Sequence, residues 1–124
     1  MKNLKKIKGD ASFRKFFRKK NKDYSSILIK SKKDKFKNLL GYDAINKILN
    51  KNKVLAPSLI QENYDKSYIE IQDLGDESIF KILSRKKNKY IYFKKIVKLL
   101  NQIQLIRDKS IKNFKKKKYK IPKY

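Results

Sequence analysis

The sequence predicts an α+β fold, in which a small antiparallel sheet with one inserted helix is followed by further helices. Three observations lead to this prediction. Short runs of strand-like composition stand on both sides of a segment with helical spacing at residues 35–50. A longer helical pattern follows at residues 89–111. Hydrophobic residues form 40% of the 124-residue chain, enough to bury the core of one modest domain.

Two strands are predicted before the first helix, at residues 12–20 and 24–31. The first run is rich in aromatic residues, and the second contains the apolar residues Ile27, Leu28 and Ile29. The connecting residues 21–23 include Asn and Asp, which tolerate turn geometry. These two strands should therefore pair as a hairpin.

A helix is predicted at residues 35–50, because apolar residues recur there at intervals of three and four. Asp34 is a suitable N-cap for it. Pro57 ends any helix, and strands are predicted at residues 58–62 and 67–72. In the second of these strands the isoleucines alternate with polar residues, so one face should be buried.

The remaining chain is predicted to be helical up to a basic tail. Asp76 is suited to cap a short helix that continues to about residue 84. A longer helix is predicted at residues 89–111, with an apolar stripe that serves core packing. Residues 112–124 contain four consecutive lysines and are predicted to be a solvated connector without a packed element.

The formal net charge of +25 suggests a nucleic-acid partner, but the composition weakens that interpretation. The cations are 32 Lys and only 4 Arg, beside 16 Ile and 10 Asn, which indicates a bias toward A/T-rich codons. Arg is the residue preferred for bidentate contacts to phosphates and bases. Nucleic acid is therefore not the expected partner, although the composition does not exclude it.

The sequence lacks the residues and segments that several kinds of functional site, and a membrane or secreted location, would require. Without Cys or His there is no disulfide, no thiol or imidazole metal site, and no histidine base. No stretch approaches the roughly 18 apolar residues that span a bilayer, and the first ten residues lack the apolar core of a secretory signal. We expect a cytoplasmic protein with no membrane partner.

Three segments stand out, in this order: Gly-Asp-Ala-Ser-Phe-Arg at 9–14, Ala-Pro-Ser-Leu-Ile at 56–60 and Ile-Gln-Asp-Leu-Gly-Asp at 71–76. Together they resemble the bacterial N-acetylmuramate and N-acetylglucosamine kinases of the aminoglycoside phosphotransferase family. Gly-Asp-Ala-Ser-Phe-Arg at 9–14, with Phe-Phe-Arg at 16–18, is similar to their GDASFRRYFR-type opening. Ala-Pro-Ser-Leu-Ile at 56–60 is similar to their AP-x-(I/V)-L strand entry. Ile-Gln-Asp-Leu-Gly-Asp at 71–76 is similar to their LLEDLGD joint between lobes. The resemblance covers about residues 7–111.

The resemblance implies three parts for the chain. Residues 1–74 would form a kinase-like N-terminal lobe with the nucleotide-binding sheet and helix, and residues 75–111 the helices after the hinge. Residues 112–124 would be a basic connector that stops before the catalytic lobe. The implied cofactor is ATP, bound as in a kinase, because the chain has no GxxxxGK[ST] loop.

The resemblance also implies a set of nucleotide-binding residues. Gly9 and Ser12 would lie in the loop that covers the phosphates, where glycine permits close approach of the backbone. Lys30 is the candidate lysine for the α and β phosphates, and Asp43 is placed to pair with it. The expected adenine contacts come from the backbone of the hinge and from apolar side chains, namely Gln72, Asp73 and Leu74 with Leu28, Ile60 and Ile71.

The chemistry of this family belongs to its C-terminal lobe. The resemblance implies an HGDxxxxN catalytic loop and a later Asp for Mg²⁺, whereas this chain has no His and only 50 residues after Leu74. No D-x-x-x-x-N segment stands in a suitable place there. We expect the N-terminal part of a kinase, from a truncated reading frame, a split reading frame or a cut chain, with no catalytic residue or metal ligand of its own and inactive alone. Its expected partners are the nucleotide and, in the case of a split frame, a separately encoded C-terminal kinase lobe.

Two other functions stay open at this point. A small Lys-rich RNA-binding protein would stack bases on its aromatic residues, the candidates being Phe13, Phe16, Phe17, Tyr90 and Tyr92. A lysine-rich module that binds a protein partner is the third possibility, supported mainly by the basic tail.

Overall fold

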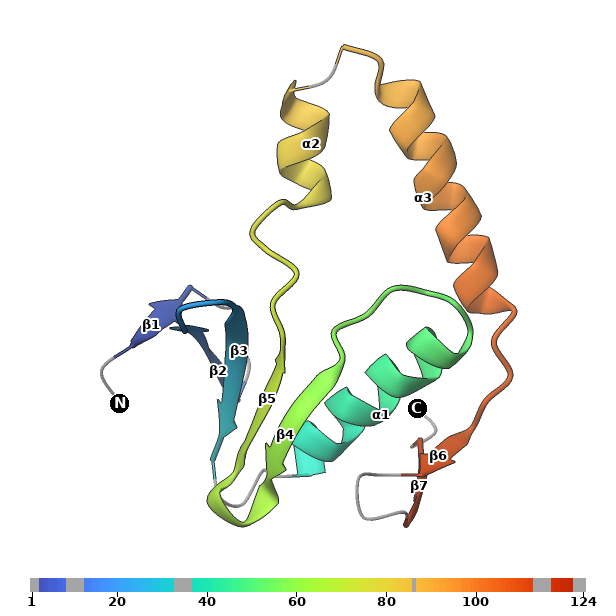
Figure 1. Cartoon of the computed structure of the whole chain (residues 1–124). Helices are drawn as coiled ribbons and strands as arrows, with labels where there is room; N and C mark the ends of the chain where they lie inside the picture. The colour runs from blue at the N-terminus through green and yellow to red at the C-terminus, as the bar shows by residue number, and fades with distance from the viewer. Residues whose placement is uncertain (1–2, 9–12, 33–36, 86, 113–116, 122–124) are drawn as a thin grey trace.

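The computed structural model describes residues 3–8, 13–32, 37–85, 87–112 and 117–121 (Figure 1). Two predicted features lie outside the described residues. They are the turn that contains Gly9 and Ser12, and the helix cap expected at Asp34.

Five antiparallel strands form the main sheet of the described chain, in the order β1-β2-β3-β5-β4 (Figure 1). The strands are β1 (Leu4–Ile7), β2 (Arg14–Lys20), β3 (Ser25–Ser31), β4 (Leu59–Asn63) and β5 (Tyr68–Gln72). Helix α1, Lys37–Lys51, connects β3 to β4, and the chain then returns as β5 to pair with β3. The predicted α+β class, with a small antiparallel sheet and one inserted helix, is confirmed.

The edge strand β1 is missing from the sequence prediction. It pairs with β2 over four residues, from Leu4 opposite Lys19 to Ile7 opposite Phe16. Only its first and last residues are apolar, and Lys5 and Lys6 between them are exposed. Lysines are frequent on edge strands because they discourage pairing with another chain. This four-residue segment is therefore too short, and contains too much lysine, for its apolar pattern to predict a strand.

The hydrophobic core lies between α1 and one face of the sheet. Its buried residues are Ile27, Ile29, Leu39, Ile69 and Ile71. Successive residues of a strand point to opposite faces, so Ile27 and Ile29 on β3 share the core face with Ile69 and Ile71 on β5. The alternation predicted for β5 is thereby confirmed.

Side chains are also buried on the opposite face of the sheet, which α1 does not cover. Leu28 and Ser26 on β3 and Glu70 on β5 are almost fully buried on this side. Ser26 Oγ donates a 2.6 Å hydrogen bond to Glu70 Oε1, and Lys19 Nζ lies 3.8 Å from the same oxygen. β3 is therefore buried on both faces, which explains its continuous apolar run.

Helices α2 (Ile79–Arg85) and α3 (Lys89–Gln104) follow the sheet and diverge from the loop that joins them (Figure 1). The prediction that the second helix reaches residue 111 is wrong. The apolar spacing does continue through Leu105 and Ile106, but the chain leaves the helix there. Lys51 and Asn52 at the end of α1 bind the Asp108 carboxylate and hold the chain beside α1.

The C-terminal segment was predicted to contain no packed element, and this prediction is also wrong. β6 (Ser110–Lys112) and β7 (Lys118–Lys120) pair as a short antiparallel hairpin, and β6 contacts α1. The Tyr119 hydroxyl approaches α1 at Gly41 so closely that a Cβ there would lie 3.3 Å from it. A basic sequence can still form a strand when one face has an apolar surface to cover.

Candidate functional site

A hollow of about 240 Å³ opens where the core face of the sheet meets the segment after β5. We call it the hinge hollow. Its apolar part comes from four strands, β1, β2, β3 and β5, and from α1, and its rim is the chain at residues 72–76. The lining side chains from the sheet and α1 are Ile7, Phe16, Arg18, Ile27, Tyr42 and Ile71, joined by Pro57. The register explains this grouping, since Ile7 lies opposite Phe16 and Ile27 lies opposite Ile71.

Arg18 fixes the rim of the hinge hollow to the sheet. Its Nε donates to Asp73 Oδ2 at 2.8 Å, and its Nη2 donates to Asp76 Oδ1 at 2.8 Å. Asp73 Oδ2 also accepts from Ser25 Oγ at 2.7 Å, and Asp73 Oδ1 accepts from the Gly75 N–H at 2.8 Å. Gly75 has φ +88°, a left-handed conformation in which a side chain would be strained.

The charges of this network reinforce one another. Hydrogen bonds from Arg18, then from Ser25, hold the pKa of Asp73 well below its ordinary range. The same contacts, first with Asp73 and then with Asp76, raise the pKa of Arg18. The Asp73 carboxylate is occupied by donors and stays ionised, so it serves the structure of the joint and is unsuited to proton transfer.

The three predicted hinge residues all line the hollow. Gln72 donates its N–H to the Ser58 carbonyl oxygen at 2.9 Å, which holds this end of β5 in the sheet. Outside the sheet ladder, the backbone N–H and carbonyl groups of Asp73 and Leu74 make no hydrogen bond to the backbone of another described residue. The Leu74 side chain is half exposed. The rim therefore offers backbone donors and acceptors beside an apolar surface.

Lys30 and Asp43, predicted to pair, lie apart in the fold. Lys30 follows Ile29 on β3, so its side chain leaves the sheet on the face opposite α1, with Nζ 5.5 Å from the centre of the Phe17 ring. Asp43 is buried on α1, where its Oδ2 lies 2.6 Å from Lys47 Nζ. The prediction placed Lys30 in the right strand but did not account for its face.

Leu28 and Ile60, predicted to hold the adenine ring with Ile71, also lie elsewhere. Leu28 stands opposite Glu70 on the far face of the sheet, by the same alternation. Ile60 lies at an irregularity in the β4–β5 register and is half exposed. Of these three residues, Ile71 alone lines the hinge hollow.

Burial raises the pKa of the Asp43 carboxyl, and the hydrogen bond with Lys47 opposes that rise. Replacing Lys47 with methionine should therefore raise the pKa of Asp43 further, because the burial remains and the cation is gone. The measurement is an NMR titration of the Asp43 carboxyl carbon in both proteins. An unchanged titration midpoint would contradict this account of Asp43.

Asp108 has the D-x-x-x-x-N spacing of a kinase catalytic loop with Asn113, although no such segment was expected in a suitable place after the hinge. Asn113 lies outside the described residues. The Asp108 carboxylate accepts from Lys51 Nζ at 2.8 Å and from Asn52 Nδ2 at 3.1 Å. The hydrogen bond from Lys51 is the main cause of its lowered pKa. These contacts assign Asp108 to the attachment of α1, and they do not favour a proton-accepting role.

Arg18 is the main residue of the site that the sequence prediction missed. A usable signal was present, because Arg occurs only four times in a chain with 32 Lys. The planar guanidinium can bind two carboxylates in a fixed geometry, which the point charge of lysine cannot do. A rare arginine in a strand is thus informative in a lysine-rich sequence.

The five aromatic residues proposed for RNA stacking do not form one surface. Phe16 packs against Tyr42 in an edge-to-face contact, with 6.5 Å between ring centres, and supports the core. Phe17 lies on the opposite face of the same strand. Tyr90 and Tyr92 belong to α3. The arrangement offers no continuous stacking platform.

Comparisons with models of known protein families, with curated proteins and with solved structures found no match to this chain. Within the described residues, no three acidic side chains gather into a group that could hold a metal ion. None of the helices in that part of the chain has the length and apolarity needed to cross a lipid bilayer.

Proposed function

We propose that this chain is the nucleotide-binding part of an ATP-dependent sugar kinase similar to the aminoglycoside phosphotransferases. One observation carries the proposal. Arg18 belongs to the opening segment that resembles the sugar kinases, and Asp73 and Asp76 belong to the segment that resembles their joint. These two segments, 55 or more residues apart, are bound together at the rim of an apolar hollow.

The hinge hollow has the chemistry that a purine base requires. Ile7, Ile27 and Ile71 supply apolar surface, and the peptide groups of Asp73 and Leu74 supply donors and acceptors for the edge of the base. Its volume of about 240 Å³ is below the roughly 300–1,000 Å³ of pockets that enclose a drug-sized ligand. The hollow would therefore hold the base, while the ribose and phosphates lie outside it.

Phosphoryl transfer is proposed for a C-terminal kinase lobe that this sequence does not contain. Such a lobe would supply the base for the acceptor hydroxyl and the carboxylate for Mg²⁺. This chain has no histidine, and the Asp108 carboxylate is occupied by Lys51 and Asn52. The function assigned to the chain itself is binding of ATP through its base.

The hinge assignment predicts that nucleotide binding depends on the backbone of Leu74 more than on its side chain. Leu74→Pro removes the N–H, and Leu74→Ala keeps it. We expect Leu74→Pro to weaken ATP binding by about tenfold, the effect of one lost hydrogen bond to a base. Leu74→Ala should change the affinity by less than about threefold. Isothermal titration calorimetry of both variants, with far-UV circular dichroism to verify folding, measures the difference.

Equal affinities for ATP in the two folded variants would contradict the proposal. Lys30→Ala provides a second control, because Lys30 lies on the face of the sheet away from the hollow. The affinity of the Lys30→Ala variant for ATP should match that of the parent chain. A loss confined to Lys30→Ala would place the nucleotide on the opposite face of the sheet.

A further inference from the structure

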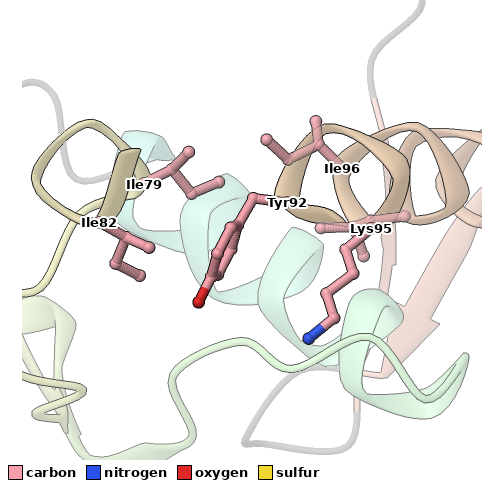
Figure 2. A pocket seen from close by; sticks show the side chains of 6 residues that line it. Ile79, Ile82, Tyr92, Lys95 and Ile96 are labelled. Atoms are coloured by element: carbon pink, nitrogen blue, oxygen red, sulfur yellow. The ribbon is translucent and has the colours of Figure 1, made fainter. Parts of the chain in front are cut away.

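Helix α3 presents an apolar face that the fold leaves uncovered. None of its 16 residues is buried. Tyr92, Ile96 and Leu99 recur at intervals of four and three, and they line a hollow together with Ile79 and Ile82 of α2. Figure 2 shows the side chains of Tyr92 and Ile96 beside those of Ile79 and Ile82. Lys95 completes the lining of a groove of about 160 Å³. We call this the α2–α3 groove.

The two helices of the groove lack the packing that normally stabilises a helix. α2 has seven residues, fewer than the about 12–15 below which an isolated helix is marginal in water, and most helical stability in proteins comes from packing of the apolar face. Ile79 and Leu99 on the two walls remain 50% and 38% exposed. The apolar face is continuous on the next side of α3, where Phe93, Val97 and Leu100 are half exposed. Apolar patches of this extent mark interaction surfaces.

The positive charge around the groove indicates which kind of partner it would bind. Residues 78–107 contain nine Lys or Arg and no Asp or Glu. Lys95 stands at the edge of the groove, with Nζ 5.7 Å from the Tyr92 ring centre, where it can meet a carboxylate next to an apolar anchor (Figure 2). A second copy of this chain would bring the same cations and a net charge of +25 against them. The complementary surface is therefore apolar and acidic.

We propose that the α2–α3 groove binds an acidic amphipathic helix of a partner protein. Two helical walls with apolar residues one turn apart match the mode in which a helix lays its apolar face into a groove. One large apolar side chain of the partner fills the hollow between Ile79, Ile82 and Ile96. Carboxylates beside that anchor pair with Lys95 and its neighbours. This inference is independent of nucleotide binding at the hinge hollow.

The test uses the full chain and two designed 21-residue helical peptides as probes. Both carry leucine at the heptad a and d positions, and the other positions are mainly glutamate in one peptide and mainly lysine in the other. We expect the glutamate peptide to bind at least about tenfold more tightly in fluorescence anisotropy, with affinity that falls as salt rises. Equal binding of both peptides, or binding of neither, would overturn the proposal.

Matched variants locate the binding surface. Ile79→Glu with Leu99→Glu places two negative charges on the walls, and Tyr90→Glu with Asn101→Glu places two on the side of α3 away from the groove. All four positions are exposed, so each variant should fold. The wall variant should lose about tenfold or more in affinity for the glutamate peptide, and the control less than about threefold. Equal losses would overturn the proposal.

Two further measurements exclude the other occupants. In light scattering after size exclusion the chain should be monomeric, and a dimer abolished by the wall variant would assign the groove to a second copy. Addition of phosphatidylglycerol vesicles should not reduce the binding of the glutamate peptide to α3. Binding of the groove to vesicles, without binding to the peptide, would assign it to a lipid surface.

Discussion

Replacing Arg18 with methionine should lower the free energy of unfolding by about 2–3 kcal/mol, because the change leaves the Asp73 carboxylate without its cation. Methionine keeps much of the apolar stem, so the loss reports on the guanidinium. The Asp73 side chain is 6% exposed and that of Arg18 is 15% exposed, so solvent screens their contact only weakly. Urea unfolding of the two proteins at pH 7 measures the difference.

The matched control for this change is Arg85→Met. Arg85 also pairs with a carboxylate, Glu77, but both side chains of that pair are more than half exposed. Exposed pairs contribute little, so the control should lose less than about 1 kcal/mol. Equal losses in the two variants would show that Arg18 does not hold the hinge segment to the sheet.

The Arg18 network also predicts a dependence of stability on pH. The pKa of Asp73 is lower in the folded state than in the unfolded chain, where it is about 3.9. The stabilisation is therefore fully present above about pH 4, and it is lost as the pH falls toward the folded-state pKa. The difference between the parent chain and Arg18→Met should narrow from pH 7 to pH 2. A difference that widens on acidification would contradict this account of Asp73.

The second large effect is expected from Leu39→Ala, which should lower the free energy of unfolding by about 3–4 kcal/mol. Leu39 is fully buried, and it is the residue of α1 that belongs to the buried core cluster with Ile29 and Ile69 of the sheet. Truncation removes apolar contacts and leaves a cavity, since the surrounding strands are held by their hydrogen bonds.

Ile45→Ala is the control within the same helix, because Ile45 is half exposed and lies on the other side of α1. It should lose less than about 1 kcal/mol. Urea unfolding at pH 7 measures both variants. A loss for Leu39→Ala as small as that for Ile45→Ala would mean that α1 does not pack against the sheet.

Strong periodicity made most of the fold predictable. The isoleucines of β3 and β5 and the spacing around Leu39 on α1 define their elements without any knowledge of distant contacts. β1 and the β6–β7 hairpin were missed because each strand has only three or four residues, of which one or two are lysine and one or two are apolar or aromatic. Such strands form because a partner strand and an apolar surface are already present, which is tertiary information.

The candidate site was predictable only in part, for a similar reason. Gln72, Asp73 and Leu74 follow a clear strand and lie at its rim, and their contact with a nucleotide stays a prediction. The face taken by Lys30 depends on the register of β3, and an offset of one residue moves a side chain to the other side of the sheet. The convergence of Arg18 with Asp73 joins residues 55 positions apart. No local pattern contains that information.

Where a nucleotide base binds can be measured directly with adenosine, followed by NMR of the isoleucine methyl groups and the backbone amides. Adenosine carries no phosphate, so the net charge of +25 cannot attract it to arbitrary lysines. Saturable shifts are expected at Ile7, Ile27, Ile71 and the amide of Leu74, with none at Phe17 or Lys30. Saturable shifts confined to Phe17 and Lys30, or no shifts at the hinge hollow, would contradict the proposed binding of the base.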